Sequence, residues 1–155
     1  MKKLNRIAAL VLALALVFAL SACGGGEDKT IDIAALAKEL VDAGTFGEPM
    51  NALDSTVALG LYGASEDTKV SAYAGTVATA EEVAVFECAN DDAADTLMAS
   101  LEQRNQTRIA QYESYDAEEV PKLENAVILS GGRYVVLIVA QDASAAEEIA
   151  VNALK

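Results

Sequence analysis

The first 23 residues carry the pattern of a secretory signal, and this pattern limits how much of the chain can fold. Lys2, Lys3 and Arg6 give a basic start, and an apolar run follows over residues 7–20. A run of about 14 residues is too short for a helix that crosses a bilayer, which needs about 20. It has the length of the apolar part of a signal peptide. We therefore expect residues 1–22 to be a signal peptide that takes no part in the fold.

A cysteine follows the signal directly. Leu20-Ser21-Ala22-Cys23 resembles the lipobox of bacterial lipoproteins, in which the cysteine thiol receives a diacylglycerol and becomes the new N-terminus. We expect lipidation of Cys23, with a plain signal peptide and an incidental cysteine as the alternative. Residues 23–30 are glycine-rich and charged, which is typical of a flexible tether. The membrane is thus an expected partner, through the lipid on Cys23.

The part of the chain after the signal is strongly acidic. The full chain has 11 basic and 24 acidic residues, and the signal holds three of the bases, so residues 23–155 carry 8 against 24 and a formal charge of −16. Such a charge disfavours nucleic acid, whose binding needs basic patches. Two interpretations stay open: a solvated surface, or a surface for a cation-rich partner such as a basic protein. With Cys23 lipidated, Cys88 has no cysteine partner for a disulfide.

Residues 31–155 predict a single α+β domain. Its expected sheet has four mainly antiparallel strands, formed by two hairpins packed by helices in the order ααββαββα. Helical spacing of apolar residues and capping residues indicate helices at 32–43, 54–62, 90–112 and 144–154. Apolar runs indicate strands at 70–78, 82–89, 126–130 and 133–140. The last two strands flank Gly131-Gly132, a typical two-residue hairpin loop.

Some details of these elements are also predicted. Asp32 and Gly44 should cap the first helix at its two ends, and Ser144 with Glu147 should form a capping box in the last helix. The strand at 82–89 has apolar residues on both faces, so it should be an inner strand covered by helices. The apolar side chains expected to face inward are Val57, Ala58 and Leu61 in the second helix, Val83 and Val85 on one face of that strand, and Ala84, Phe86 and Cys88 on its other face.

The available side chains argue against an enzyme. The chain has no histidine and no tryptophan, which excludes a Ser-His-Asp triad and removes the commonest metal ligand. Ser-x-x-Lys does not occur, and Cys88 is expected to be a buried, inert thiol. We therefore expect no catalytic residues, no metal site and no cofactor. The acidic groups that do not match a calcium loop are Asp91, Asp92 and Asp95, and Asp116, Glu118 and Glu119.

The long helix carries the most informative polar residues. Its apolar stripe ends near Leu101, and the same face then becomes polar, so its polar groups need partners when buried. One interpretation pairs them with loop carbonyls and acids of the fold, with Arg108 on a carboxylate. The other is a recognition patch for a carboxylate, a sugar or a partner loop. The residues of this candidate binding patch are Arg104, Asn105, Arg108, Tyr112, Tyr115 and, beside the Gly-Gly turn, Arg133.

The layout of these features resembles a known family. The features that carry the resemblance are the lipobox, Glu82-Val83-Ala84-Val85-Phe86, Arg104, Gln111-Tyr112, Tyr115, Asn125-Ala126-Val127 and the strand Gly132-Arg133-Tyr134-Val135-Val136-Leu137. Together they resemble the domain-of-unknown-function family numbered 4358, small lipoproteins of Gram-positive anaerobes. The resemblance implies a location on the outer face of the cytoplasmic membrane, and it implies no activity or site residues.

These features favour a function in binding. We expect a membrane-anchored extracytoplasmic lipoprotein that acts as a non-enzymatic binding or interaction module of the cell envelope, with an envelope protein as its partner. The alternative is a small-ligand-binding accessory protein of a membrane transporter. An enzyme is the third option.

Overall fold

Five antiparallel strands in the order β1-β2-β3-β5-β4 form the centre of the fold. They belong to a computed structural model that describes residues 29–155, so the predicted signal peptide, Cys23 and most of the tether lie outside the described residues. The α+β class and the antiparallel pairing are confirmed, whereas the prediction of four strands is wrong. The strands are β1 Asn51–Ala52, β2 Lys69–Ala74, β3 Glu82–Glu87, β4 Val127–Gly131 and β5 Tyr134–Val139.

The additional strand, β1, is too short to show a sequence pattern. Asn51 pairs with Ala74 and Ala52 with Tyr73, which adds β1 to the outer side of β2. A two-residue strand has no alternation of apolar and polar side chains, on which strand prediction depends. Its formation therefore depends on the exposed backbone of β2 rather than on its own residues.

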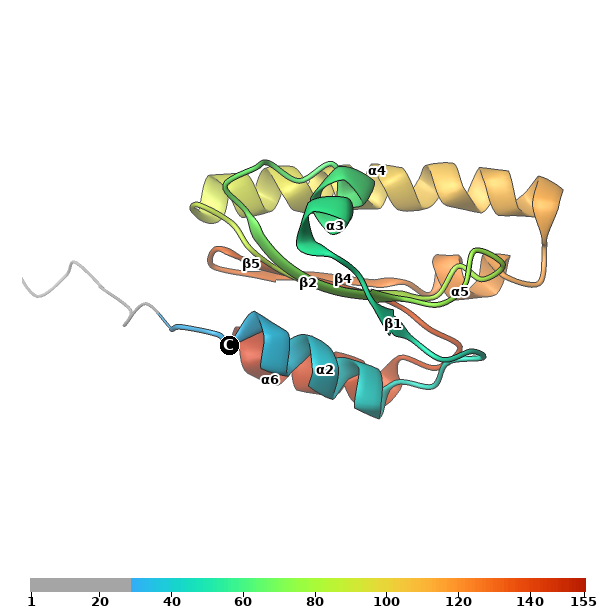
Figure 1. The fold of residues 1–155 in the computed structure, drawn as a ribbon, viewed down its shortest axis with the longest axis horizontal. Coiled ribbons are helices and arrows are strands. Elements are labelled where there is room, and N and C mark those ends of the chain that lie inside the picture. The colour runs from blue at the N-terminus through green and yellow to red at the C-terminus, as the bar shows by residue number, and fades with distance from the viewer. Residues whose placement is uncertain (1–28) are drawn as a thin grey trace, which may run out of the picture. The chain divides into compact units, whose positions relative to one another are not determined.

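Helices cover both faces of the sheet, so residues 31–155 form three layers (Figure 1). The helices α2, Ile33–Ala43, and α6, Ser144–Leu154, pack side by side on one face. The helices α3, Ser55–Tyr62, and α4, Asp91–Tyr115, cover the other face. A short helix, α5 at Val120–Glu124, joins α4 to β4. No helix in the described residues is both long enough and apolar enough to cross a membrane.

Strand β3 lies at the middle of the sheet and is apolar on both faces, as predicted. Val83 and Val85 pack against the layer of α2 and α6. Ala84 and Phe86 pack against the layer of α3 and α4, together with the buried thiol of Cys88 just after the strand. The alternation of strand side chains thus divides the core into two halves, and it explains why both helix layers are held by the same strand.

The predicted helix ends are partly correct. The side chain of Asp32 accepts hydrogen bonds from the backbone of Ala34 and Ala35 at 3.1 and 3.0 Å, and α2 ends at Gly44, as expected. In α6 the capping box is wrong, because Ser144 is already inside the helix. The acid two residues earlier takes this role, since Asp142 Oδ1 accepts from the Ser144 N–H at 2.9 Å.

The inward face of α3 also differs from the prediction. Ala58 and Tyr62 are the buried residues, while Val57 and Leu61 are 59% and 46% exposed. Nearly every side of this short helix is apolar, so its sequence does not single out one face. The ring of Tyr62 decides the orientation, because it packs edge-on against Phe86 with their ring centroids 5.3 Å apart.

The second hairpin is shifted by one residue from the predicted loop. Gly131 belongs to β4 and pairs with Tyr134, so the loop consists of Gly132 and Arg133. Gly132 has a φ of 54°, a left-handed conformation that favours glycine. Gly131 is needed for space instead, since a Cβ atom there would lie 2.5 Å from the carbonyl oxygen of Leu154. The long helix α4 ends at Tyr115, about one turn later than predicted.

Candidate functional site

Two arginines of α4 converge on one buried carboxylate, Glu82, at the start of β3. Arg104 Nη1 and Arg108 Nη1 each lie 2.6 Å from Glu82 Oε1, and Arg104 Nη2 lies 3.1 Å from Oε2. The side chain of Glu82 is only 3% exposed. Residues four apart on a helix lie on the same face, which is why both guanidinium groups reach the same acid.

Tyr62 and Ala80 complete this cluster. The guanidinium carbon of Arg104 lies 4.8 Å from the centroid of the Tyr62 ring, and the Tyr62 hydroxyl donates to Glu82 Oε2 at 3.4 Å. Burial raises the pKa of Tyr62 well above its usual range, so its hydroxyl stays protonated as a donor. Arg108 Nη2 also donates to the carbonyl of Ala80 at 3.1 Å. The interpretation that pairs Arg108 with an acid of the fold is therefore confirmed.

The other polar residues of α4 lie farther along the helix or beside it. Asn105 Nδ2 donates to the buried carbonyl of Leu123 at 2.8 Å, while its Oδ1 has no hydrogen-bond partner among residues 29–155. Tyr112 lies under Arg108, with 5.7 Å from guanidinium carbon to ring centroid. Tyr115 is 77% exposed at the end of the helix. Of these residues, Asn105 links α4 to α5.

Arg133 does not join the other arginines. It pairs with Glu87 at 2.9 Å, and its guanidinium lies 5.5 Å from the ring centroid of Tyr134. Glu87 ends β3, whereas Glu82 begins it. The predicted binding patch is thus divided between the two ends of one strand, and a binding role for its residues stays a prediction.

A second cluster of buried charges lies next to Glu82 and was not predicted. The side chain of Glu81 is fully buried and accepts two hydrogen bonds from the Gly47 N–H, at 2.8 and 3.0 Å. Lys122 Nζ lies 3.0 Å from Glu81 and 2.8 Å from Glu119. The sequence does hold a signal for these two clusters, namely the adjacent acids Glu81 and Glu82 just before an apolar strand. Neighbouring residues of a strand point to opposite faces of the sheet, so each acid needs a separate partner when both are buried.

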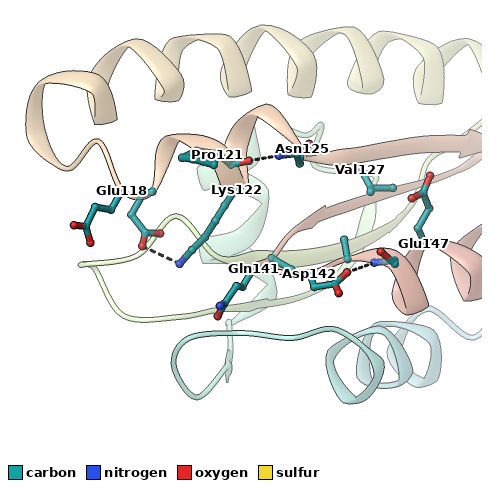
Figure 2. A pocket seen from close by; sticks show the side chains of 12 residues that line it. Glu118, Pro121, Lys122, Asn125, Val127, Gln141, Asp142 and Glu147 are labelled. Carbon is teal, nitrogen blue, oxygen red and sulfur yellow. Dashed lines mark hydrogen bonds and ion pairs between the residues drawn. The ribbon is translucent and has the colours of Figure 1, made fainter.

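Beside this cluster is an open, polar cleft of ≈ 630 Å³ (Figure 2). Its walls come from α5, from the residues that follow β5 and from the first turn of α6. Figure 2 shows the Lys122 side chain directed toward an acid next to Glu118, and the Asp142 carboxylate bonded to the start of α6. The side chains that form most of its polar wall are Glu118, Glu119, Lys122, Gln141, Asp142 and Glu147.

The charges in this cleft are unbalanced. Burial opposes the charge of Glu119, but hydrogen bonds from Lys122, the Ala80 N–H and Thr79 lower its pKa below the usual range. Burial likewise opposes the charge of Lys122, but Glu119 and Glu81 raise its pKa. The one ammonium that lines the cleft is therefore engaged by two carboxylates. Glu118 and Glu147 form no ion pair within residues 29–155, so the free charge in the cleft is negative.

The described residues contain no group of three or more histidine, cysteine, aspartate or glutamate side chains arranged to hold a metal ion. Burial raises the pKa of the Cys88 thiol, which disfavours the reactive thiolate. This face carries an open polar cleft, bordered by the ion pairs of Lys122 with Glu81 and Glu119, that can accept a polar or cationic group.

The fold and the cleft together define a small three-layer α+β domain with a polar cleft beside α5 and the start of α6. The sequence model of the family described as Domain of unknown function (DUF4358) matches residues 45–140. The chain belongs to this family, as the sequence resemblance indicated. The matched segment runs from just before β1 to the end of β5 and leaves out α2 and α6. Comparisons with curated proteins and with solved structures gave no match.

Proposed function

We propose that this protein is a lipid-anchored extracytoplasmic lipoprotein whose domain is a non-enzymatic binding module of the cell envelope. The single observation that supports binding is the open cleft, where Glu118, Asp142 and Glu147 have no ion pair within residues 29–155. The support for the anchor is the lipobox pattern that ends at Cys23. Lipid contributes about 0.8 kcal/mol per buried methylene, so the chains on one cysteine hold a soluble domain at a bilayer.

The buried charges favour binding over catalysis. Glu81 and Glu82 are held in place by Lys122 and by two arginines, so these acids stabilise the fold and are not exposed to a substrate. The ion pairs of Glu82 hold α4 against β3, and the ion pair of Glu81 with Lys122 holds α5 there. Helix α5 in turn forms one wall of the cleft. A rigid wall lowers the entropy lost when a partner is bound.

The charge of the cleft indicates the kind of partner. Residues 23–155 carry a formal charge of −16, from 8 basic and 24 acidic residues. A cleft with unpaired carboxylates on such a surface attracts cations over a distance of about 10 Å at moderate salt. We therefore favour a basic segment of an envelope protein. Anionic partners, including nucleic acid, are disfavoured by the same charge.

The second candidate function is a small-ligand-binding accessory protein of a membrane transporter. The observation that favours it is the size of the cleft, since ≈ 630 Å³ falls within the range of about 300–1,000 Å³ typical of small-molecule sites. A rise in melting temperature with one polyamine or cationic amino acid, but not with acidic metabolites, supports this function. No rise with any cationic metabolite contradicts it.

The anchor has a direct test. Cys23→Ala should move the protein from the membrane fraction to the soluble fraction or leave its signal uncleaved, and it should abolish labelling by a radioactive fatty acid. Cys88→Ala is the matched control, because that thiol is buried in the core, and labelling should persist. Unchanged membrane association and labelling of the Cys23→Ala variant would contradict the anchor.

A further inference from the structure

Strand β4 forms an edge of the sheet that is not protected against pairing. It is the last strand in the order β1-β2-β3-β5-β4, and no described segment pairs with its outer side. Its residues, Val-Ile-Leu-Ser-Gly, include neither a charge nor a proline. Proteins commonly place charged residues, prolines or bulges on exposed edges to prevent strand addition, so the composition of β4 leaves this edge available.

The register shows which backbone groups of β4 are available. Gly131 and Tyr134 flank the two-residue loop and pair with each other, so their backbone groups point toward the partner strand of the hairpin. The next residue, Arg133, points the other way, because its carbonyl accepts from the Cys88 N–H beyond β3 at 2.8 Å. Backbone groups alternate in direction along a strand. Ile128 and Ser130 therefore direct their N–H and C=O groups away from β5, where an added strand would meet them.

On the α4 side, this edge borders a groove with two acidic lining residues. The groove measures ≈ 540 Å³ and lies between α4 and β4, with Glu102 from α4 and Glu124 from α5 among its lining residues and no cation. Asn105 forms its inner wall, and the Oδ1 atom of this side chain lacks a partner among the described residues. An added side chain that enters this groove is best matched by a cation or another hydrogen-bond donor.

On the α6 side, the same edge borders an apolar groove. This groove measures ≈ 200 Å³; Leu129, Val151 and Leu154 form its apolar wall, and Ser130 and Lys155 complete its lining. Alternate side chains of an added strand point to opposite faces of the sheet. One face of that strand thus meets the carboxylates of Glu102 and Glu124, and the other meets mainly aliphatic side chains, with a cation only on the α6 side at Lys155.

We propose that the β4 edge binds an extended polypeptide segment of a partner protein as a sixth strand, with basic side chains toward α4 and apolar side chains toward α6. This inference goes beyond the proposed function, because the β4 edge is a binding surface other than the cleft beside α5 and the start of α6. It follows a known mode of recognition, in which backbone hydrogen bonds give affinity and alternate side chains give specificity. The occupant is basic because its α4-facing side chains meet Glu102 and Glu124.

A second copy of this chain fits the edge less well. Its own β4 has no basic residue to place against Glu102 and Glu124, and two chains of the same large negative charge repel each other. Self-association through β4 is therefore the outcome that the test must separate from binding of a basic segment.

The test uses the full-length protein in neutral detergent and a defined probe, a blocked eight-residue peptide that alternates lysine and valine. Ser130→Pro removes the outward N–H of an exposed edge residue and is tolerated at such positions. Ser130→Thr keeps that N–H and is the matched control. A peptide N-methylated on one edge tests the same bonds without any change to the protein, and a peptide with glutamate in place of lysine tests charge.

We expect the lysine peptide to bind and to slow amide hydrogen exchange at Ile128 and Ser130, as measured by NMR. Ser130→Pro and the N-methylated peptide should each weaken binding about tenfold or more, since backbone hydrogen bonds are lost. Ser130→Thr should not weaken it. Strand addition is overturned if the Ser130→Pro variant binds the lysine peptide as tightly as the unchanged protein does and the N-methylated peptide binds as tightly as the unmodified one. It is also overturned if the unchanged protein does not bind the lysine peptide.

Two further results separate this inference from the proposed function. Protection by the peptide only at Gln141 and Asp142 in the cleft overturns strand addition and leaves the binding module in place. Dimers of the unchanged protein that Ser130→Pro dissociates, seen by analytical ultracentrifugation, overturn the basic partner in favour of a second copy.

Discussion

Arg104 places both terminal nitrogens of its guanidinium on the carboxylate of Glu82, with Nη1–Oε1 at 2.6 Å and Nη2–Oε2 at 3.1 Å. This paired geometry is the stronger form of a charge-assisted hydrogen bond. Because Glu82 begins β3 and Arg104 lies in the middle of α4, the pair fixes the position of the long helix over the sheet.

Replacement of Glu82 should therefore be costly. Glu82→Gln leaves the guanidinium groups of Arg104 and Arg108 without their carboxylate, and loss of one partner from a buried ion pair costs about 3–5 kcal/mol. Urea unfolding measures this loss. Glu87→Gln at the other end of β3 is the matched control, because its two partners, Lys69 and Arg133, are 72% and 37% exposed and exposed pairs contribute about 0–1 kcal/mol. Equal effects of the two substitutions would refute the structural role of Glu82.

The stability of the domain should fall in acid through Glu119. Its folded-state pKa lies below the ordinary value of 4.5 because the carboxylate accepts from Lys122, Thr79 and Ala80. A lowered pKa contributes stability that is fully present above the unfolded-state pKa and is lost as the pH falls through the folded-state pKa. Glu119→Gln should thus make the free energy of unfolding less dependent on pH between about pH 6 and pH 3.

The control for this effect is the neighbouring residue. Glu118→Gln removes an exposed carboxylate without these hydrogen bonds, so the acid-induced loss of stability should persist in that variant. Unfolding curves at a series of pH values measure both variants. A Glu119→Gln variant with the full acid dependence of the unchanged protein would show that Glu119 is not the group responsible.

Two glycines should respond in opposite directions to alanine. At Gly131 a Cβ atom would lie 2.5 Å from the Leu154 carbonyl oxygen, so Gly131→Ala must displace the end of α6 and should cost about 1–3 kcal/mol. At Gly60 a Cβ atom meets nothing within 4 Å, and this residue lies inside α3. Gly60→Ala should stabilise the domain by about 0.5–1 kcal/mol. Thermal unfolding gives both signs, and destabilisation by Gly60→Ala would contradict the assigned conformation of α3.

Much of the fold was predictable because its central strand has a clear pattern. The alternation of Val83 and Val85 with Ala84 and Phe86 indicates an inner strand with helices on both sides, and the structure has this arrangement. The periodic apolar face of α2 and its Asp32 cap were equally clear. In each case the local pattern and the tertiary packing favour the same structure.

The parts that were not predicted depend on tertiary contacts. Strand β1 has two residues and forms only because β2 offers an open edge. The orientation of α3 depends on one contact between Tyr62 and Phe86. The cleft is formed by α5 and by residues after β5, which lie about twenty residues apart in the sequence. The arginines of α4 were identified as polar residues that need partners, but their common partner Glu82 was not.

The charge of the cleft is open to a direct test. Replacement of both Glu118 and Glu147 by glutamine should weaken capture of a basic partner without unfolding, because both side chains are exposed. Glu148→Gln is the matched control, since Glu148 is exposed on α6 and does not line the cleft. Partner recovery and unfolding curves are measured on the same variants. Equal recovery from the double variant and the control would exclude the cleft carboxylates from binding.

In-cell photo-crosslinking is the most direct test of an anchored binding module. A photoreactive residue replaces Gln141 in the cleft or, as a control, Glu113 on the exposed side of α4, and mass spectrometry identifies the products. We predict one reproducible envelope partner from position 141, absent from position 113 and lost with Cys23→Ala. Background proteins alone at position 141, or the same partner recovered after Cys23→Ala, would contradict a binding module that acts from the membrane.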